Sequence, residues 1–246
     1  MRLLVSAIDP VEARTAVAGG ADIVDVKNPF EGPLGAPAPG TIAGVRAAVP
    51  ASLPVSAAIG DPPPLPGTAA LAALGAARSG AAYVKVGLGA VASEAGAVGL
   101  LRAIRDAVGG GPACVIAAAY ADAERLGEGA FRPQLLPRVA AAAGIAGCLL
   151  DTAVKDGRGL FEWLTSEVVA SLVAEAHALG LLFALAGSLR EADLPRVLAT
   201  GADIAGVRSA ACAGGARTAS LEAERIQRLR AVCASRPTPR GAGAAG

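Results

Sequence analysis

Lysine is rare in this sequence, and its three occurrences are the first candidates for chemistry. Of 22 basic residues, 19 are arginines, and the lysines are Lys27, Lys85 and Lys155. A lysine amine can lose its proton when it is desolvated or crowded by other cations, and it can then attack a carbonyl carbon to form an imine, whereas a guanidinium stays protonated. We therefore predict that these three positions need an amine that reacts or exchanges a proton.

Two aspartates accompany the lysines. In the segment 23–27 the odd residues share one face of a strand, so Asp25 and Lys27 point the same way while the two valines point the other way. Asp151 ends another apolar segment, four residues before Lys155. Such carboxylates would offset the accumulated positive charge and polarise hydroxyl groups. The alternative is that each lysine pairs with an aspartate for stability alone.

The elements that carry these residues alternate between short β-rich segments and longer segments of helical period. This alternation predicts a single-domain (β/α)8 barrel, an α/β fold, over residues 1–234. A doubly wound sheet is the alternative, but the first strand–helix turn lacks the G-x-G-x-x-G pattern. We expect a disordered tail at 235–246, which is rich in Pro, Gly and Ala. The expected strands lie near 3–8, 22–27, 54–60, 82–88, 113–119, 147–152, 181–187 and 203–208.

A barrel of this kind gathers its chemistry at the carboxyl ends of its strands. Lys27 ends the second expected strand, Lys85 lies near the end of the fourth, and Lys155 follows the sixth. Alternate strands contribute to the same layer of the barrel interior. We therefore predict that Lys27, Lys85, Lys155, Asp25 and Asp151 meet in one catalytic site.

The loops after the last two strands are candidates for phosphate binding. Barrels of this fold often hold a phosphate there through backbone N–H groups. Gly187 and Ser188 follow the seventh strand, and Arg208, Gly214 and Gly215 lie after the eighth. We predict that these five residues bind a phosphate group of the substrate, although each glycine could instead serve only a turn.

Other polar residues admit simpler interpretations. His177, the only histidine, lies within a helical segment and is expected on the helix surface. Asp61, Tyr120 and Asp122 follow strands and could either contact substrate or cap turns. The proline-rich segment 28–35 directly follows Lys27 and suits a lid or a wall of the pocket.

Composition argues against several classes of protein. A net charge of +1 gives no basis for a nucleic-acid or membrane-surface binder. The mean hydropathy is positive, yet no uninterrupted apolar segment of about 20 residues is present, so no membrane span is expected. The four cysteines form no C-x-x-C pair, and we predict no metal, no cofactor and reduced thiols. The amino-terminal segment fits a first strand rather than a signal peptide, and we expect a cytoplasmic protein.

Six segments resemble the (5-formylfuran-3-yl)methyl phosphate synthases, also called 4-(hydroxymethyl)-2-furancarboxaldehyde-phosphate synthases. The resemblance extends to about residue 234, and its lysine motifs DVKNP, YVKVG and LDTAVKDG are intact. The segments are LLVSAID, GGADIVDVKNPFEGPLGA, AALGAARSGAAYVKVGL, LLDTAVKDGRGLF, ALAGSL and GVRSAACAGG.

The resemblance implies a cytoplasmic lyase that condenses two molecules of glyceraldehyde 3-phosphate into a furan aldehyde phosphate, releasing one phosphate and water. This step leads toward methanofuran or its analogue, carriers of one-carbon units. The resemblance also implies a Schiff base on Lys27, proton acceptance by Lys85, further active-site positions at Asp25, Asp151 and Lys155, and a homo-oligomer. Two alternatives stay open: another class I Schiff-base aldolase acting on a small sugar phosphate, and a non-enzymatic barrel that binds a sugar phosphate to regulate a partner.

Overall fold

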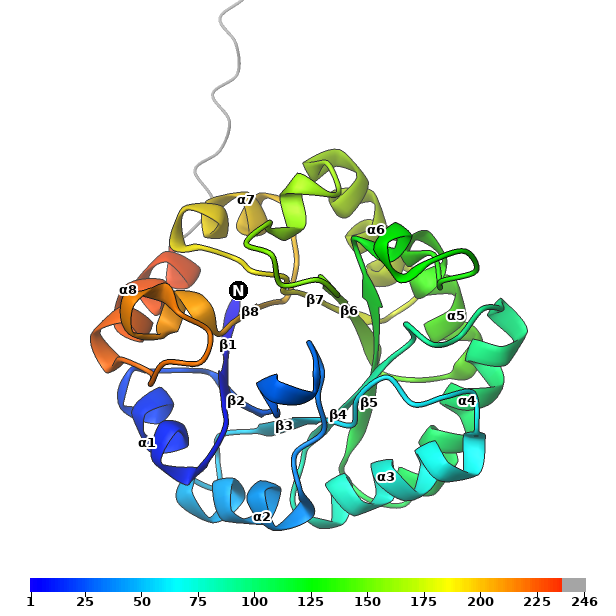
Figure 1. Cartoon of the computed structure of the whole chain (residues 1–246), viewed down its shortest axis with the longest axis horizontal. Helices are drawn as coiled ribbons and strands as arrows, with labels where there is room; N and C mark the ends of the chain where they lie inside the picture. Colours follow the sequence, from blue (N-terminus) through cyan, green and yellow to red (C-terminus); the bar gives the residue numbers. More distant parts are fainter. Residues whose placement is uncertain (236–246) are drawn as a thin grey trace, which may run out of the picture.

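Eight parallel strands close into a barrel in the order of the sequence, with β1 paired to both β2 and β8 (Figure 1). The computed structural model describes residues 1–235. This closure confirms the predicted (β/α)8 barrel and excludes the doubly wound sheet. The strands are β1 (Arg2–Ala7), β2 (Ile23–Val26), β3 (Val55–Ala58), β4 (Tyr83–Gly87), β5 (Cys114–Tyr120), β6 (Gly147–Asp151), β7 (Leu182–Leu185) and β8 (Ile204–Val207).

A helix follows each strand and covers the outside of the barrel (Figure 1). Every strand falls where the sequence predicts it, within about two residues at most ends. The predicted tail at 235–246 lies, apart from Ser235, outside the described residues. The helices are α1 (Pro10–Ala18), α2 (Pro39–Ala48), α3 (Pro66–Arg78), α4 (Glu94–Val108), α5 (Leu136–Ala143), α6 (Ser166–Ala178), α7 (Leu194–Ala199) and α8 (Ala223–Ala234).

Strand alternation divides the apolar side chains into two groups. Val24 and Val26 point outward and join the large core between the strands and the helices. A smaller group fills the barrel interior, and three of its members are alanines from β3, β5 and β7. Small interior side chains leave room beside them, so the end of the barrel at the carboxyl termini of the strands can hold polar groups and a cavity.

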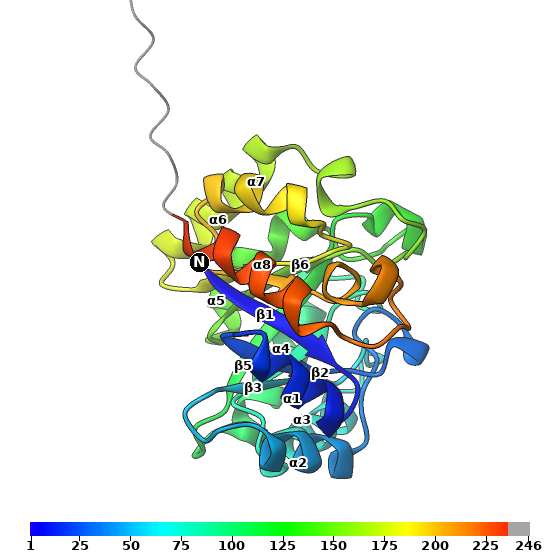
Figure 2. The ribbon, with the colours of Figure 1, turned by 90° about the vertical axis from the view of Figure 1, so that its left-hand side faces the viewer.

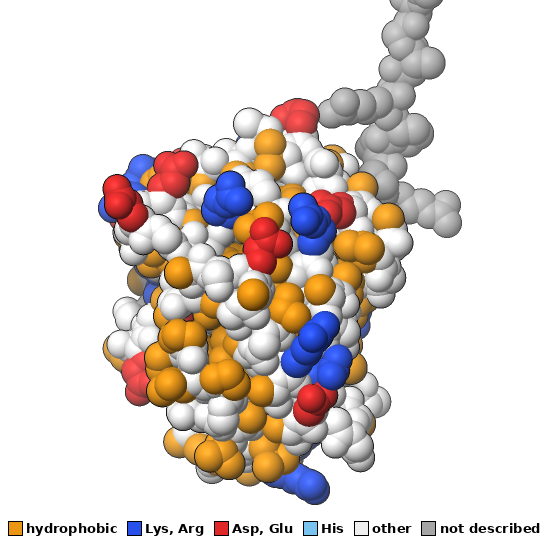
Figure 3. All heavy atoms as spheres, turned by 90° about the vertical axis from the view of Figure 1, so that its right-hand side faces the viewer, with side chains coloured by type: hydrophobic (Ala, Val, Ile, Leu, Met, Phe, Trp, Pro, Cys, Tyr) orange, Lys and Arg blue, Asp and Glu red, His pale blue; other side chains and the backbone are white. Residues whose placement is uncertain are grey.

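The first and last elements meet where the barrel closes. In Figure 2, β1 runs between α1 and α8, and the amino group of Met1 donates a hydrogen bond to the Cys233 carbonyl at the end of α8 (3.4 Å). Figure 3 shows charges of both signs scattered among apolar side chains on another face, with no field of one sign. Among residues 1–235 no helix is long and apolar enough to cross a membrane.

Candidate active site

The five residues predicted to be catalytic gather around one cavity of about 580 Å³ in the barrel. Lys27 follows β2, Lys85 lies within β4, and Asp151 ends β6 just before the loop that carries Lys155. Strand alternation turns Asp25, Lys85 and Asp151 inward, because their neighbours Val24, Val84 and Leu150 pack outward against the helices. The cavity is of the size that binds small metabolites.

Lys85 and Asp25 form a buried ion pair. The Lys85 Nζ lies 2.7 Å from the Asp25 Oδ1, although this approach is not aligned as a hydrogen bond. The other carboxylate oxygen of Asp25 accepts a hydrogen bond from the Ser6 hydroxyl (2.9 Å). Ser6 lies opposite Asp25 in the register of β1 and β2, so the sheet itself sets this contact. A buried charge needs such partners to offset its lost hydration.

Lys155 and Asp151 form a second ion pair, four residues apart. The Lys155 ammonium donates hydrogen bonds to the Asp151 carboxylate (2.7 Å) and to the Thr152 hydroxyl (3.0 Å). Burial alone would raise the pKa of Asp151, but the positive charges of Lys155 and Lys27, with the hydrogen bonds to the carboxylate, lower it to about 2. Asp151 is therefore a fixed negative charge at neutral pH.

Lys27 differs from the other two lysines because it has no paired carboxylate. It lines the cavity, its side chain is buried, and no hydrogen bond or ion pair joins its ammonium to another residue of the described chain. The pKa of Lys27 is lowered to about 8, chiefly by burial. The negative charges of Asp151 and Asp25 raise this pKa, and the positive charges of Lys85 and Lys155 lower it. A substantial fraction of this amine is neutral near pH 8 and can act as a nucleophile.

The cavity as a whole attracts anions. Seven cationic side chains line it against three acidic ones, whereas the whole chain has a net charge of only +1. Positive charge is therefore concentrated in the cavity, where low-dielectric walls strengthen its field. The cations are Lys27, Lys85, Lys155, Arg190, Arg208, Arg217 and Arg225, and the acids are Asp25, Asp151 and Glu191.

The loop after β7 lines this cavity with residues whose backbone N–H groups lack partners in the described chain. Gly187 and Ser188 line it with φ of 95° and 50°, and Ser188 is the one non-glycine residue in the described chain with a positive φ. A Cβ on Gly187 would lie 3.0 Å from the backbone of Thr152. No hydrogen bond to a described residue occupies the N–H of Gly187 or of Ser188. Strained backbone of this kind is concentrated at ligand sites.

The loop after β8 lies differently from the prediction. The N–H groups of Ser209 and Ala210, which line the cavity, have no partner among the described residues. Gly214 does not line the cavity, and the N–H of Gly215 is already donated to the Cys212 carbonyl (3.0 Å). The glycines shape this turn, with φ of 61° and 74°, and the free amides belong to the residues before them.

The guanidinium of Arg208, a predicted phosphate ligand, is fully engaged by groups of the described chain. Its guanidinium donates two hydrogen bonds to the Glu12 carboxylate (2.7 and 3.2 Å). Its remaining donors go to the carbonyl oxygens of Ser6, Arg217 and Ala219 (2.9, 2.8 and 3.4 Å). All five N–H groups are engaged, so Arg208 fastens the closing strands and the loop after β8.

A cap formed by residues 28–35 covers part of the barrel mouth. Figure 1 shows this segment, in blue, curling over the centre of the barrel after β2. Leu34 is buried in the barrel interior, and the Asn28 N–H donates to the Gly35 carbonyl (2.9 Å). Gly35 is required there, because a Cβ would lie 2.1 Å from the Asn28 carbonyl oxygen. The Arg217 Nη2 holds the cap from the other side through the Gly32 carbonyl (2.8 Å).

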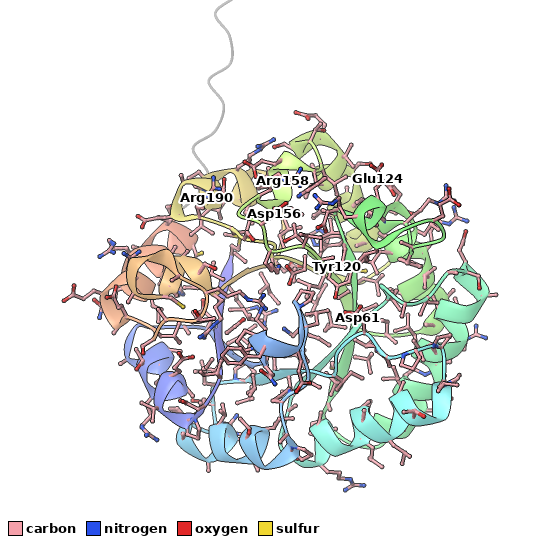
Figure 4. The ribbon with its side chains drawn as sticks, in the orientation of Figure 1. Asp61, Tyr120, Glu124, Asp156, Arg158 and Arg190 are labelled. Atoms are coloured by element: carbon pink, nitrogen blue, oxygen red, sulfur yellow. The ribbon has the colours of Figure 1, made fainter. Side chains whose placement is uncertain are left out.

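The remaining candidates lie outside the cavity. Asp61 and Tyr120 are hydrogen-bonded to each other beside β5 (Figure 4), and burial raises the pKa of both groups. The buried Asp122 accepts the N–H groups of Ala153 and Val154 (2.6 and 2.8 Å). His177 lies on the surface of α6, as its helical setting predicts, and the structure shows that it contacts Asp203.

Several site residues escaped the sequence analysis. Ser6 is an ordinary strand residue in the sequence, and only the register with β2 pairs it with Asp25. Arg217 lies two residues after Gly215, the last residue of the predicted phosphate loop, and this position is the signal that could have identified it. The four cysteines form no disulfide. No metal-binding group of three or more His, Cys, Asp or Glu residues occurs within the described chain.

Comparison with known structures locates the fold among barrel enzymes. The 3-hexulose-6-phosphate synthase from Salmonella typhimurium superposes with a TM-score of 0.67 at 17% identity, covering 95% of this chain and 98% of that one. A phosphoribosyl anthranilate isomerase from Thermus thermophilus gives a TM-score of 0.59 at 20% identity, with 94% and 98% covered. At this identity the likeness concerns the fold alone.

Sequence relatives are much closer. The (5-formylfuran-3-yl)methyl phosphate synthase of Methanocaldococcus jannaschii is 48% identical over 238 residues, covering 95% of this chain and 100% of the relative. The enzyme of the same name from Methanosarcina mazei is 47% identical over 235 residues, with 95% and 99% covered. The 4-HFC-P synthase family model matches residues 3–230, a span that holds the three lysines, both aspartates, the cap and both loops of the cavity. The chain is therefore an enzyme of the 4-HFC-P synthase family.

Proposed function

We propose that this enzyme condenses two molecules of glyceraldehyde 3-phosphate into (5-formylfuran-3-yl)methyl phosphate through a Schiff base on Lys27. The observation that carries the proposal is the unpaired Lys27 amine, which faces a cavity where the other two lysines are each 2.7 Å from a carboxylate. The names of the close relatives supply the product.

The first stage is imine formation and proton removal. The neutral Lys27 amine attacks the aldehyde carbon of one triose phosphate, and water leaves. The protonated imine then acidifies the adjacent carbon. Lys85 in its neutral form accepts that proton, and Asp25 stabilises the resulting ammonium from 2.7 Å.

The second stage joins the two molecules and closes the ring. The enamine carbon joins the terminal carbon of the second triose phosphate, the carbon that loses its phosphate, which forms the new carbon–carbon bond and leaves the aldehyde of that molecule as the formyl group of the product. Elimination of one phosphate, ring closure, dehydration and release from Lys27 give the aromatic furan, and overall one phosphate and two waters are lost. Lys155, held by Asp151 and Thr152, is placed to donate and accept protons in these eliminations.

The cationic cavity and the free amides of Gly187, Ser188, Ser209 and Ala210 support a phosphorylated substrate. We place this reaction in the pathway to methanofuran or an analogue, and we expect a cytoplasmic homo-oligomer that needs no metal or organic cofactor. These expectations follow from the family resemblance and from the amine chemistry, which requires no electron transfer.

Borohydride trapping tests the proposal. Wild-type enzyme, treated with borohydride in the presence of glyceraldehyde 3-phosphate, should carry a reduced adduct on the peptide that contains Lys27, as read by mass spectrometry. The control is Lys27→Arg, which keeps the charge and should carry none. An adduct confined to another lysine would contradict the assignment of the Schiff base to Lys27.

Product absorbance separates the furan synthase from a class I aldolase. An aromatic furan aldehyde absorbs strongly in the near ultraviolet, and an aldol product does not. Trapping at Lys27 together with new near-ultraviolet absorbance supports the synthase. Trapping without that absorbance would identify an aldolase that stops before the furan.

A further inference from the structure

Arg217 is a cationic side chain of the cavity to which the mechanism above gives no role. Its guanidinium makes one hydrogen bond within the described chain, from Nη2 to the Gly32 carbonyl (2.8 Å). Four of its five donors are therefore free. By contrast, Arg208 has used all five. Of these two guanidinium groups, only that of Arg217 can still bind an anion in the fork geometry that suits phosphate.

The surroundings of Arg217 favour an anion. The side chain lines the cavity and is half-buried, and no carboxylate forms an ion pair with it. Burial lowers the pKa of the Arg217 guanidinium, and the charge of Asp151 offsets this effect only in part, so a bound dianion would remove the remaining cost. Arg190 also lines the cavity and, like Arg217, makes one guanidinium hydrogen bond, to the Gly157 carbonyl, but its side chain is exposed and keeps its hydration. Arg225 is already paired with Glu222.

The single bond that Arg217 makes leads to the cap over Lys27. Gly32 lies in the middle of the cap, whose internal hydrogen bonds involve the N–H groups of Asn28, Phe30 and Glu31. The contact spans 185 residues of sequence and joins the loop after β8 to the loop after β2. A ligand that fixes the guanidinium therefore also fixes the Gly32 carbonyl.

We infer that Arg217 binds a phosphate group of the substrate and, through Gly32, couples phosphate binding to the position of the cap over Lys27. Arg217 is thus a specificity-determining residue for phosphorylated aldehydes. This inference rests on the proposed sugar-phosphate substrate, but its test with inorganic phosphate does not depend on the reaction.

The first measurement is phosphate affinity, by isothermal titration with inorganic phosphate. Arg217→Gln should weaken binding about 10- to 100-fold, because it removes a charge-assisted, forked contact. Arg217→Lys keeps the charge without the fork and should recover part of the loss. Arg138→Gln, on the exposed surface of α5, is the matched control and should bind as wild type.

The second measurement is hydrogen exchange of the cap amides in residues 28–35. At a phosphate concentration ten times the dissociation constant, exchange in wild type should slow by up to about tenfold, because the ligand stabilises the closed form by mass action. In Arg217→Gln, phosphate at ten times its own dissociation constant should leave cap exchange unchanged. Arg217→Lys should bind phosphate yet give little protection. A variant that merely loosened the loop would exchange faster but would still respond to phosphate.

The third measurement compares substrates. Arg217→Gln should lower kcat/KM for glyceraldehyde 3-phosphate while leaving borohydride trapping of unphosphorylated glyceraldehyde unchanged.

Unaltered phosphate affinity in Arg217→Gln, or equal losses with both aldehydes, would overturn the inference. If phosphate binding needs Arg217 but no furan forms, the proposed function fails and the role of Arg217 stands. If Arg217→Gln makes the furan at the wild-type rate with unchanged phosphate affinity, the proposed function stands and the role of Arg217 fails.

Discussion

The two loops that flank the cavity differ in the number of contacts that hold them. Three hydrogen bonds fasten the loop after β6 to neighbouring loops, whereas one joins the cap after β2 to the loop after β8. The loop after β6, which carries Lys155, is fastened at both ends: Asp122 accepts two of its N–H groups, and Arg190 donates to its Gly157 carbonyl (2.7 Å). The side chains Asp156, Arg158 and Arg190 lie together on this part of the rim (Figure 4). The cap after β2 is joined to the loop after β8 through the Arg217–Gly32 contact.

The lysines of these two regions also differ in whether a carboxylate holds them. Lys155 is paired to Asp151 inside its fastened loop, whereas Lys27, beneath the cap, has no such partner. A group that only transfers protons benefits from a fixed position, while a nucleophile must be neutral and unpaired to attack. The difference suggests that rigidity serves the proton-transfer side and that access serves the covalent side.

Replacing the lysines one at a time by arginine gives the largest expected effects. Lys27→Arg should lower turnover of glyceraldehyde 3-phosphate by about 10³-fold or more, because guanidinium cannot form the imine. Lys155→Arg keeps the ion pair with Asp151 and should lose less. The measurement is furan formation followed by absorbance. Equal losses in the two variants would break the proposed division between covalent and proton-transfer lysines.

Freeing the fastened loop should cost less than removing the nucleophile. Asp122→Ala leaves the N–H groups of Ala153 and Val154 without their acceptor and should lower kcat about 10- to 100-fold through misplacement of Lys155. Trapping at Lys27 should continue, since β2 is untouched. Asp106→Ala, on the exposed surface of α4, is the control. Loss of trapping in Asp122→Ala would show that the two sides are not separable.

The pH dependence of trapping tests the unpaired state of Lys27. Because the pKa of Lys27 is lowered to about 8, the neutral fraction should rise about tenfold per pH unit below 8 and level off above it. Initial trapping rates should follow this curve. Asp151, with a pKa near 2, should add no transition between pH 5 and 8. A plateau reached only near pH 10 would mean that Lys27 is not desolvated in the enzyme.

The smallest effect is on stability. The folded pKa of Lys27, about 8, lies below its ordinary value of 10.5, so folding disfavours the charged form. The penalty is fully present below pH 8 and is relieved as pH rises toward 10.5. Lys27→Met should therefore raise the free energy of unfolding at pH 7 by about 1–3 kcal/mol while abolishing activity. Denaturant unfolding at pH 7 and pH 10 measures this gain, which should shrink at the higher pH.

Much of this architecture could be predicted from local patterns. Period-two alternation around Asp25, Lys85 and Asp151 identifies inward-facing positions, because a strand turns successive side chains to opposite faces. The alternation of strands and helices gives the barrel, and the barrel brings the three lysines to one cavity. The loops after β7 and β8, predicted to bind phosphate, both line the cavity, but the free amides in the loop after β8 are those of Ser209 and Ala210 rather than of the glycines.

The sequence by itself determined the eight strand–helix units and the inward direction of the lysines and aspartates, since both follow from local periodicity. Only the tertiary structure decided which lysine lacks a carboxylate and which arginine is free. Glu12 and Arg208 are 196 residues apart, and barrel closure alone brings them together and consumes that guanidinium. The single guanidinium bond of Arg217 likewise joins loops that are 185 residues apart, the loop after β8 and the cap after β2, so no local pattern could assign its partner.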